Sequence, residues 1–205
     1  MLYFISLALI RIFFRIMGKI TYIGTENIPK TGGVILAPNH ISYADPPVVG
    51  FGVHRQVHFM AKEELFKAPV SGAWIRSVGS FPVRRGAADR RALKCAIDML
   101  NEGGAVCLFP EGTRSIDGKL QEPELGIGMI ALKTRAPVVP VAIMGTDKVL
   151  PIHAKYPHRH PMKVIYGKPL EFRDLYDIDH TRHTYKEVGR RIMTAIADLL
   201  LKHAS

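Results

Sequence analysis

A histidine and an aspartate lie five residues apart in the chain, at His40 and Asp45, after the apolar run of residues 34–37. On one straight helix this spacing would place the two side chains about 140° apart, so they can meet only if the backbone bends. Pro46 favours a bend, because the residue before a proline adopts extended angles and proline suits the first turn of a helix. We therefore expect a strand, a turn on the surface, and a helix that begins at Pro46 with Asp45 as its N-cap.

In that geometry the His40 ring can fold back onto the Asp45 carboxylate. A carboxylate that binds one imidazole nitrogen fixes the tautomer and leaves the other nitrogen available as a general base. A plainer interpretation fits this stretch equally well: Asp45 only caps the helix, and His40 is a loop histidine without a chemical role. The choice depends on what the rest of the chain places beside the pair.

A basic pair, Arg84 and Arg85, follows the short apolar run of residues 81–83 and precedes a glycine. Arginines grip phosphate oxygens through planar, charge-assisted hydrogen bonds, so this pair is a candidate phosphate site. The alternative is a solvated basic pair without a ligand. Lys62, after an expected strand at residues 57–61, is a further candidate for substrate binding.

A third charged cluster, Glu111 and Arg114 with Gly112 and Thr113 between them, follows the apolar run of residues 105–109. Open α/β sheets bind their ligands at the carboxyl ends of the strands, which is where this cluster would lie. The alternative is a local ion pair, which contributes little stability when exposed. A charged loop directly after a buried strand is more typical of a site.

Composition limits the class of protein. The chain has 205 residues, 47% of them apolar, which suits one domain or one domain with an attachment. The 28 basic and 18 acidic residues give a net charge of +10, which favours an anionic partner: a phosphate substrate, acidic lipid, an acidic carrier protein or nucleic acid. No nucleic-acid-binding motif is present, so we expect no nucleic acid partner. Cys95 and Cys107 fall in a helical pattern and an apolar strand, as buried thiols do in a reducing compartment.

The first 17 residues are almost all apolar, but Arg11, Arg15 and Lys19 recur every four residues and so would line one face of a helix. The run is shorter than the roughly 20 apolar residues of a spanning helix, and its charges follow the apolar stretch, unlike those of a signal peptide. We expect an amphipathic helix at residues 1–19 that lies in a membrane interface, attached to a domain at residues 20–205. The alternative is a soluble helix packed on that domain.

Apolar runs alternate with helical patterns along the rest of the chain, which predicts an α/β fold with a mainly parallel sheet flanked by helices. Further strands are expected at residues 20–23, 137–143 and 162–166, and further helices at residues 87–101, 127–135 and 185–201. Pro140 inside its strand predicts a bulge or an edge position.

Two other patterns carry no function. Gly126 and Gly128 nominally match a dinucleotide-binding fingerprint, but no strand precedes them, so they are expected to open a helix instead. His153, His158 and His160 have no zinc-ligand spacing, and no metal is expected.

The charged clusters in this order resemble the glycerolipid acyltransferase family, in particular the 1-acyl-glycerol-3-phosphate acyltransferases. His40 and Asp45 match the family's His-x-x-x-x-Asp block, and residues 109–115 match its third block residue for residue. Residues 79–85 resemble the second block and residues 138–142 the fourth.

The resemblance covers roughly residues 21–170, and the chain departs from the family pattern at two places. Arg84 takes a position that often holds an acidic residue. Glu124 and Leu125 stand before Gly126, where the family often has a lysine, which bears on the identity of the acceptor lipid.

The resemblance implies transfer of a fatty acyl group from a thioester to the free hydroxyl of lysophosphatidic acid. His40 would be the general base and Asp45 would orient its ring, while Arg85 and Arg114 would bind the phosphate and Glu111 the glycerol part. The remaining candidate substrate-binding residues are Arg84, Lys62, Gly112 and Thr113.

The resemblance also implies acyl-CoA or an acyl carrier protein as co-substrate, no cofactor, and the cytoplasmic face of an anionic membrane as the location. Two alternatives stay open. One is a related acyltransferase for another lysolipid or for glycerol-3-phosphate. The other is a basic peripheral membrane-binding protein without enzymatic activity.

Overall fold

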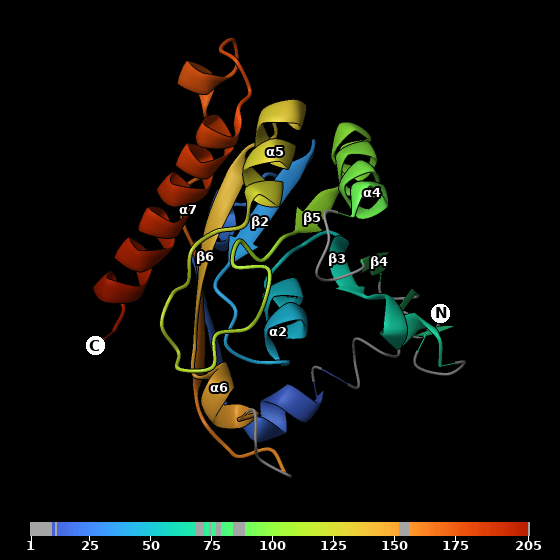
Figure 1. Ribbon diagram of the computed structural model, residues 1–205. Coiled ribbons are helices and arrows are strands. Elements are labelled where there is room, and N and C mark those ends of the chain that lie inside the picture. The colour runs from blue at the N-terminus through green and yellow to red at the C-terminus, as the bar shows by residue number, and fades with distance from the viewer. Residues whose placement is uncertain are drawn as a thin grey trace.

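The computed structural model of the protein describes residues 10, 12–68, 72–73, 75–76, 79–83, 89–151 and 156–204 (Figure 1). Its strands are β1 (Ile20–Ile23), β2 (Val34–Pro38), β3 (Val57–Lys62), β4 (Phe81–Val83), β5 (Ala105–Cys107), β6 (Val138–Met144) and β7 (Met162–Tyr166). Its helices include α2 (Asp45–Phe51), α4 (Arg90–Asn101), α5 (Leu125–Thr134), α6 (Thr146–Val149) and α7 (Arg182–Lys202). Short 3-10 turns lie at Thr25–Asn27, Glu63–Phe66 and Arg173–Leu175.

Within these ranges the strands form one sheet in the order β1-β7-β6-β2-β5-β3-β4. Strands β2 to β6 run parallel to one another, while β7 is antiparallel to β6 and β1 is parallel to β7. The expected mainly parallel α/β sheet is therefore confirmed. Its central strand is β2, which lies between β5 and β6 and leads directly to His40.

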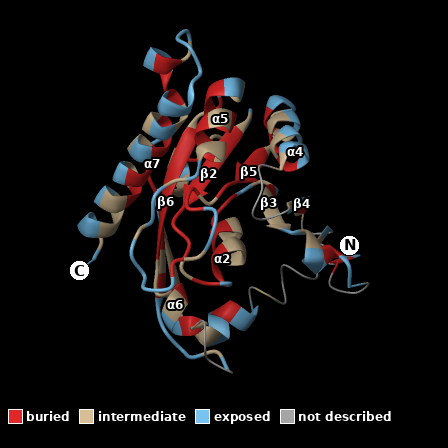
Figure 2. Ribbon diagram, in the orientation of Figure 1, coloured by how far each residue is buried: buried red, intermediate tan, exposed pale blue. Residues whose placement is uncertain are grey.

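Both faces of the sheet are covered, as Figure 2 shows by the buried colour of β2, β5 and β6. Ile35 and Ala37 of β2 pack into a core with α4, α5 and α7, whereas Val34 and Leu36 pack into a second core with α2. Alternate residues of a strand point to opposite faces, so a strand covered on both sides must be apolar throughout. All five residues of β2 are buried, which explains its unbroken apolar sequence.

The expected helix at residues 87–101 begins at Arg90 in the structure, and residues 84–88 lie outside the described ranges. The carboxylate of Asp89 sets this start, because it accepts hydrogen bonds from the backbone N–H groups of Arg91 and Ala92. Both cysteines are free, and burial raises the pKa of the Cys107 thiol well above its ordinary value.

Pro140 does not lie at an edge, because β6 pairs with β2 on one side and β7 on the other. The pairing beside it is irregular instead. Val141 pairs with Tyr166 and Val138 with Leu170, so the three residues 167–169, beyond the end of β7, lie opposite only residues 139 and 140 of β6. The irregular pairing leaves room for a residue that has no N–H to donate.

The N-terminal segment is helical at residues 12–17, and Phe14 is buried with its ring edge against Phe51 of α2. Ile12, Phe13 and Ile16 instead remain 55%, 41% and 55% exposed. In the described part of the chain, no helix is both long and apolar enough to cross a bilayer. The division of the chain at residue 19 stays a prediction.

The glycine pattern that resembles a dinucleotide-binding fingerprint is explained by helix packing at Gly128. Helix α5 crosses α7 at this glycine, and a Cβ there would lie 2.2 Å from the backbone oxygen of Tyr185. A Cβ at Gly126 would meet only Leu93 Cδ2, at an ordinary contact distance of 3.5 Å. The first glycine is therefore optional, while the second is required for the close approach of two helices.

We expect Gly128→Ala to lower the free energy of unfolding by about 1–3 kcal/mol or more, because two backbones must separate to admit the methyl group. Gly126→Ala is the matched control and should be neutral or stabilising by up to about 1 kcal/mol, since alanine favours helix. Denaturant unfolding of both variants tests the pair. Equal effects of the two substitutions would contradict the packing role of Gly128.

Candidate active site

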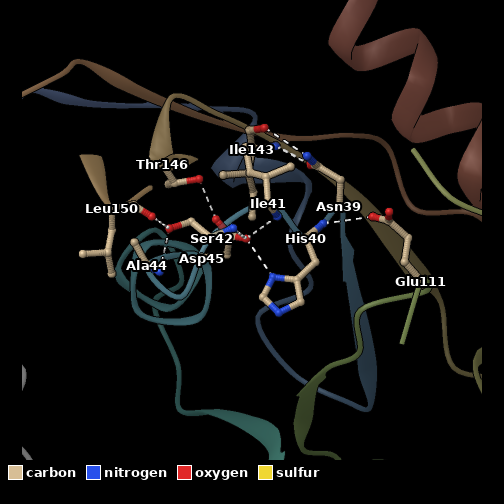
Figure 3. Close-up of polar contacts among 10 residues, drawn as sticks. All are labelled: Asn39, His40, Ile41, Ser42, Ala44, Asp45, Glu111, Ile143, Thr146 and Leu150. Carbon is tan, nitrogen blue, oxygen red and sulfur yellow. Dashed lines mark hydrogen bonds and ion pairs between the residues drawn. The ribbon is translucent and has the colours of Figure 1, made fainter. Parts of the chain in front are cut away.

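Residues from the segments that follow three parallel strands meet beside His40, as Figure 3 shows for Asp45, Glu111 and Thr146. The loop of residues 39–44 follows β2, the loop of residues 108–115 follows β5, and α6 follows β6. Clusters that are far apart in sequence are thereby brought into contact, as expected for strands that end at the same edge of a parallel sheet.

The Asp45 carboxylate is fully buried and accepts hydrogen bonds on both oxygens. Its Oδ2 lies 2.8 Å from His40 Nδ1, and it accepts the N–H groups of Ile41 at 2.7 Å and Ser42 at 2.8 Å. Its Oδ1 accepts the hydroxyl of Thr146 at 2.6 Å. Because a buried carboxylate is costly without partners, this set of donors holds the negative charge beside the ring.

The expectation that Asp45 caps the following helix is wrong. Helix α2 begins at Asp45 itself, with Ala44 at the N-cap position and no side-chain cap bond. The carboxylate points back into the preceding loop because its donors all lie there or beyond β6, so it cannot also reach forward to the helix N–H groups. The expected contact with His40 is nevertheless formed.

His40 is buried, which corrects the expectation of a surface loop. Its N–H donates to Glu111 Oε1 at 3.0 Å, its carbonyl accepts the N–H of Ser115 at 2.8 Å, and its ring stacks on Phe109 with centroids 3.9 Å apart. With Nδ1 directed to Asp45, the ring has one orientation. Nε2 has no hydrogen-bond partner among the described residues and points away from the labelled groups in Figure 3.

The same loop is also tied to the β6 side of the site. The Asn39 side chain makes two hydrogen bonds to the backbone of Ile143, donating to its carbonyl at 3.1 Å and accepting its N–H at 2.7 Å. The Ser42 hydroxyl donates to the carbonyl of Leu150 at 3.1 Å. Ser42 is therefore used in packing the turn, and the loop has little freedom to move relative to β6.

Glu111 links two loops rather than forming an ion pair with Arg114. One carboxylate oxygen accepts the N–H of His40 and the other accepts the N–H of Gln121, both at 3.0 Å. Burial raises the pKa of the Glu111 carboxyl, although the two N–H donors favour its charged form. The geometry gives this carboxylate a direct part in holding the His40 backbone.

Arg114 lies over the aromatic face of Tyr43, with its guanidinium carbon 3.4 Å from the ring centroid. Its Nη1 is buried and has no hydrogen-bond partner among the described residues. A buried cationic donor without an acceptor is costly, so such a nitrogen is suited to an anionic ligand. Tyr43 stands between His40 and Asp45 in the chain, which brings the guanidinium to the same loop.

The other candidates are placed as follows. Gly112 and Thr113 are exposed in the turn after β5, where Gly112 has a φ of 66°, a left-handed conformation that favours glycine. Lys62 is exposed at the end of β3 and pairs in register with Val83, the residue before Arg84. Arg84 and Arg85 lie outside the described residues. Their substrate contacts stay predictions.

Sequence reasoning missed Thr146, Asn39 and Tyr43 as parts of the site. Asn39 could have been noticed as a polar residue at the end of a buried strand. Thr146 and Tyr43 carry no such signal, because their partners lie 101 and 71 residues away in sequence. Within the described ranges, no group of three or more His, Cys, Asp or Glu side chains is placed to hold a metal ion.

Comparison with known proteins gives consistent matches. A family model described as Acyltransferase matches residues 19–144. A 1-acyl-sn-glycerol-3-phosphate acyltransferase of Bacillus subtilis is 32% identical over 167 residues, which are 80% of each protein. The chloroplastic 1-acyl-sn-glycerol-3-phosphate acyltransferase LPAT1 of Arabidopsis thaliana is 33% identical over 74% of this chain but only 44% of its own length.

A solved structure matches most of the fold. The crystal structure of the 1-acyl-sn-glycerophosphate (LPA) acyltransferase PlsC from Thermotoga maritima superposes with a TM-score of 0.75 and 30% identity. The match covers 94% of this chain and 79% of that one.

We expect Glu111→Ala to lower the free energy of unfolding by about 1–3 kcal/mol for each buried N–H that it leaves unpaired. Glu111→Gln should cost less, because the amide oxygen can still accept one of the two bonds. Thermal or denaturant unfolding measures both, with exposed Glu122→Ala on the same loop as a control that should change stability by no more than about 0.5 kcal/mol. Unchanged stability of Glu111→Ala, together with a raised KM for the acceptor, would assign this carboxylate to the substrate instead.

Proposed function

Because the chain belongs to the Acyltransferase family, we propose that it transfers a fatty acyl group from an acyl thioester to the free hydroxyl of lysophosphatidic acid, giving phosphatidic acid. The observation that carries the proposal is the buried His40–Asp45 pair, with Nδ1 and Oδ2 2.8 Å apart and Nε2 directed away from the carboxylate. This is the arrangement that a general base requires. Similarity to the 1-acyl-sn-glycerol-3-phosphate acyltransferases of Bacillus subtilis and Thermotoga maritima favours the lysophosphatidic acid acceptor over others.

The reaction needs one proton to move twice. Nε2 of His40 takes the proton of the acceptor hydroxyl while the hydroxyl oxygen attacks the thioester carbonyl, and Asp45 stabilises the resulting imidazolium. The tetrahedral intermediate then collapses, the C–S bond breaks, and the imidazolium returns the proton to the departing thiolate. The products are an ester and a free thiol, and His40 is restored.

The acceptor phosphate fits the basic side of the site. Arg114 carries a buried Nη1 without a hydrogen-bond partner among the described residues, and its stacking on Tyr43 limits the directions in which the guanidinium can face. We assign the phosphate to Arg114 and Arg85, with Arg84 and the exposed Lys62, Gly112 and Thr113 as further contacts. Glu111 would reach the glycerol part only through its remaining acceptor capacity, because both oxygens already accept N–H bonds.

The acyl donor is either acyl-CoA or an acyl carrier protein. Both are acidic, so the net charge of +10 suits each of them. A basic membrane-binding protein without activity is a weaker alternative, because it would have no use for a buried aspartate that orients a histidine.

We place the protein at the cytoplasmic face of an anionic membrane. The helix of residues 12–17 packs inward through Phe14 but exposes Ile12, Phe13 and Ile16, and the nearby Arg15 and Lys19 are also exposed. An apolar surface beside basic side chains suits the interface of an anionic bilayer, and this arrangement combines packing on the domain with contact to lipid.

Purified protein should acylate lysophosphatidic acid from acyl-CoA or acyl carrier protein in a panel that also contains glycerol-3-phosphate and other lysolipids. His40→Ala and His40→Gln should each lower kcat by about 10²–10⁴-fold, since both remove the base. His183→Ala, on the exposed side of α7, is the control and should retain full activity. If either His40 variant kept more than about a tenth of the wild-type kcat, the general-base mechanism would be excluded.

The same panel tests the phosphate contacts. Arg114→Ala and Arg85→Ala should each lower kcat/KM about ten- to hundred-fold for phosphate-bearing acceptors and much less for a phosphate-free analogue. Arg114→Lys should rescue only partly, because lysine lacks the planar fork and stacks less well on Tyr43. Equal losses on both kinds of acceptor would remove these arginines from phosphate binding.

Replacing Ile12, Phe13 and Ile16 together by serine should weaken partition to anionic vesicles at least about tenfold, because each large apolar side chain moved from water contributes about 1.5–3 kcal/mol. This set leaves the buried Phe14 in place, so the fold is preserved. Serine substitutions at Ile178 and Leu201, which are also exposed, are the control. Vesicle sedimentation measures the partition, and an unchanged value for the triple variant would show that other residues hold the membrane.

A further inference from the structure

We propose that Thr146 is a positioning residue of the His40–Asp45 pair, whose hydroxyl holds the Asp45 carboxylate in the orientation that presents Oδ2 to the imidazole. The inference rests on the proposed function, in which His40 is the base. It adds to the site a residue from a third strand end, 101 residues from Asp45 in sequence.

The hydrogen-bond pattern of Asp45 carries the proposal. Oδ2 receives three donors, namely His40 Nδ1 and the N–H groups of Ile41 and Ser42. Oδ1 receives only the Thr146 hydroxyl among the described residues, at 2.6 Å, the short distance typical of a hydroxyl bound to a carboxylate. Thr146 therefore fixes the rotation of the carboxylate about its own axis, which the donors to the other oxygen do not fix alone.

Burial makes this single contact important. Asp45 and Thr146 are both fully buried, so Oδ1 would lose its hydrogen bond without gaining bulk water if the hydroxyl were removed. An ionised oxygen without a donor in such a place is costly. The carboxylate would turn or move towards other donors, and the His40 ring would follow it.

The backbone around Thr146 is built to hold this position. Gly145 has a φ of 84°, and a Cβ there would lie 2.4 Å from the backbone oxygen of Pro161, so the turn from β6 into α6 depends on glycine. On either side of the turn, Ile143 is bound by the Asn39 side chain and Leu150 by the Ser42 hydroxyl. Residues 39–45 are thus joined by side-chain hydrogen bonds to three residues around this turn, namely Ile143, Thr146 and Leu150.

Thr146 also lies outside the part of the chain that the family model matches, because the match covers residues 19–144 and ends two residues before it. Titratable or charged groups near the pair, within the described ranges, include Glu111 on the His40 backbone, Cys107 of β5 and Arg114 over Tyr43. A substitution at Thr146 leaves all of them unchanged.

The first test compares Thr146→Val, which keeps the shape and removes the hydroxyl, with Thr146→Ser, which keeps the hydroxyl. Thr146→Val should lower kcat about 10- to 100-fold with little change in KM for either substrate, and Thr146→Ser should restore most of the loss. Thr134→Val is the control, because the Thr134 hydroxyl donates to the Ile130 carbonyl in α5, away from the site. Full activity of Thr146→Val, or equal losses in the valine and serine variants, would overturn the proposal.

A double-mutant cycle separates positioning from a general loss of stability. In the Asp45→Asn background, Thr146→Val should cost far less activity than in the wild type, because there is no carboxylate left to orient. If the loss were the same in both backgrounds, Thr146 would act independently of Asp45 and the proposal would fail. Should the valine variant not fold, Thr146→Ala, which relieves any steric conflict, takes its place in the same cycle.

A measurement that needs no substrate can tell whether this proposal fails or the proposed function fails. The hydrogen bond between His40 Nδ1 and Asp45 can be followed by NMR through the ring N–H proton, whose signal is identified by its loss in the His40→Gln spectrum. Loss of the Thr146 donor lets the carboxylate turn, so this signal should shift or broaden in Thr146→Val and return in Thr146→Ser. An unchanged signal in Thr146→Val would refute the link through Asp45. A protein that shows the shift but acylates no lysolipid would instead refute the proposed function.

Discussion

The site depends on one constraint, which is that the carboxylate of Asp45 is removed from water and must find all its donors inside the protein. The donors come from the loop that precedes it and from α6, which follows β6. A buried charge with satisfied oxygens is fixed in place, whereas one with an unmet oxygen is strongly unfavourable. The arrangement that stabilises the charge is therefore also the one that orients the histidine.

A second buried carboxylate performs a related task on the other side of β2. Glu111 uses its two oxygens to join the backbone of His40 to the loop near Gln121. His40 thus lies between Asp45, which holds its ring, and Glu111, which holds its backbone, while Phe109 covers one face of the imidazole. The central position of β2 in the sheet makes this possible, because it has a neighbour strand on each side.

Much of the fold could be predicted from the sequence. The strands at Ile20–Ile23 and Met162–Tyr166 were predicted to the residue, because each is a short apolar run with clear ends. The antiparallel direction of β7 could not be predicted, since it depends on how the chain between β6 and β7 returns to the sheet and not on the residues of the strand. The starting residue of α4 could not be predicted either, because the helix begins at Arg90 only if the Asp89 side chain caps it.

In the site, residue types were easier to predict than their partners. The pairing of His40 with Asp45 followed from a short spacing and a proline that bends the chain. The local capping rule failed at Asp45 because distant donors outweighed it, and the bonds of Glu111 could not be anticipated because both run to backbone groups. Backbone N–H groups occur at every residue except proline, so the sequence gives no sign of which ones a carboxylate will bind.

The long sequence separations in the site bear on the order in which its parts come together during folding. His40 and Asp45 are made early and lie close together in the chain, yet the bonds from Asn39 to Ile143 and from Thr146 to Asp45 span 104 and 101 residues. Contacts of this kind close large loops and form late, after the entropy of most of the chain has been lost. An N-terminal fragment of the nascent chain therefore contains the histidine and the aspartate without the distant contacts that fix their geometry. These contacts form only when β6 joins β2, so the ordering of the pair and the pairing of the two central strands are the same event.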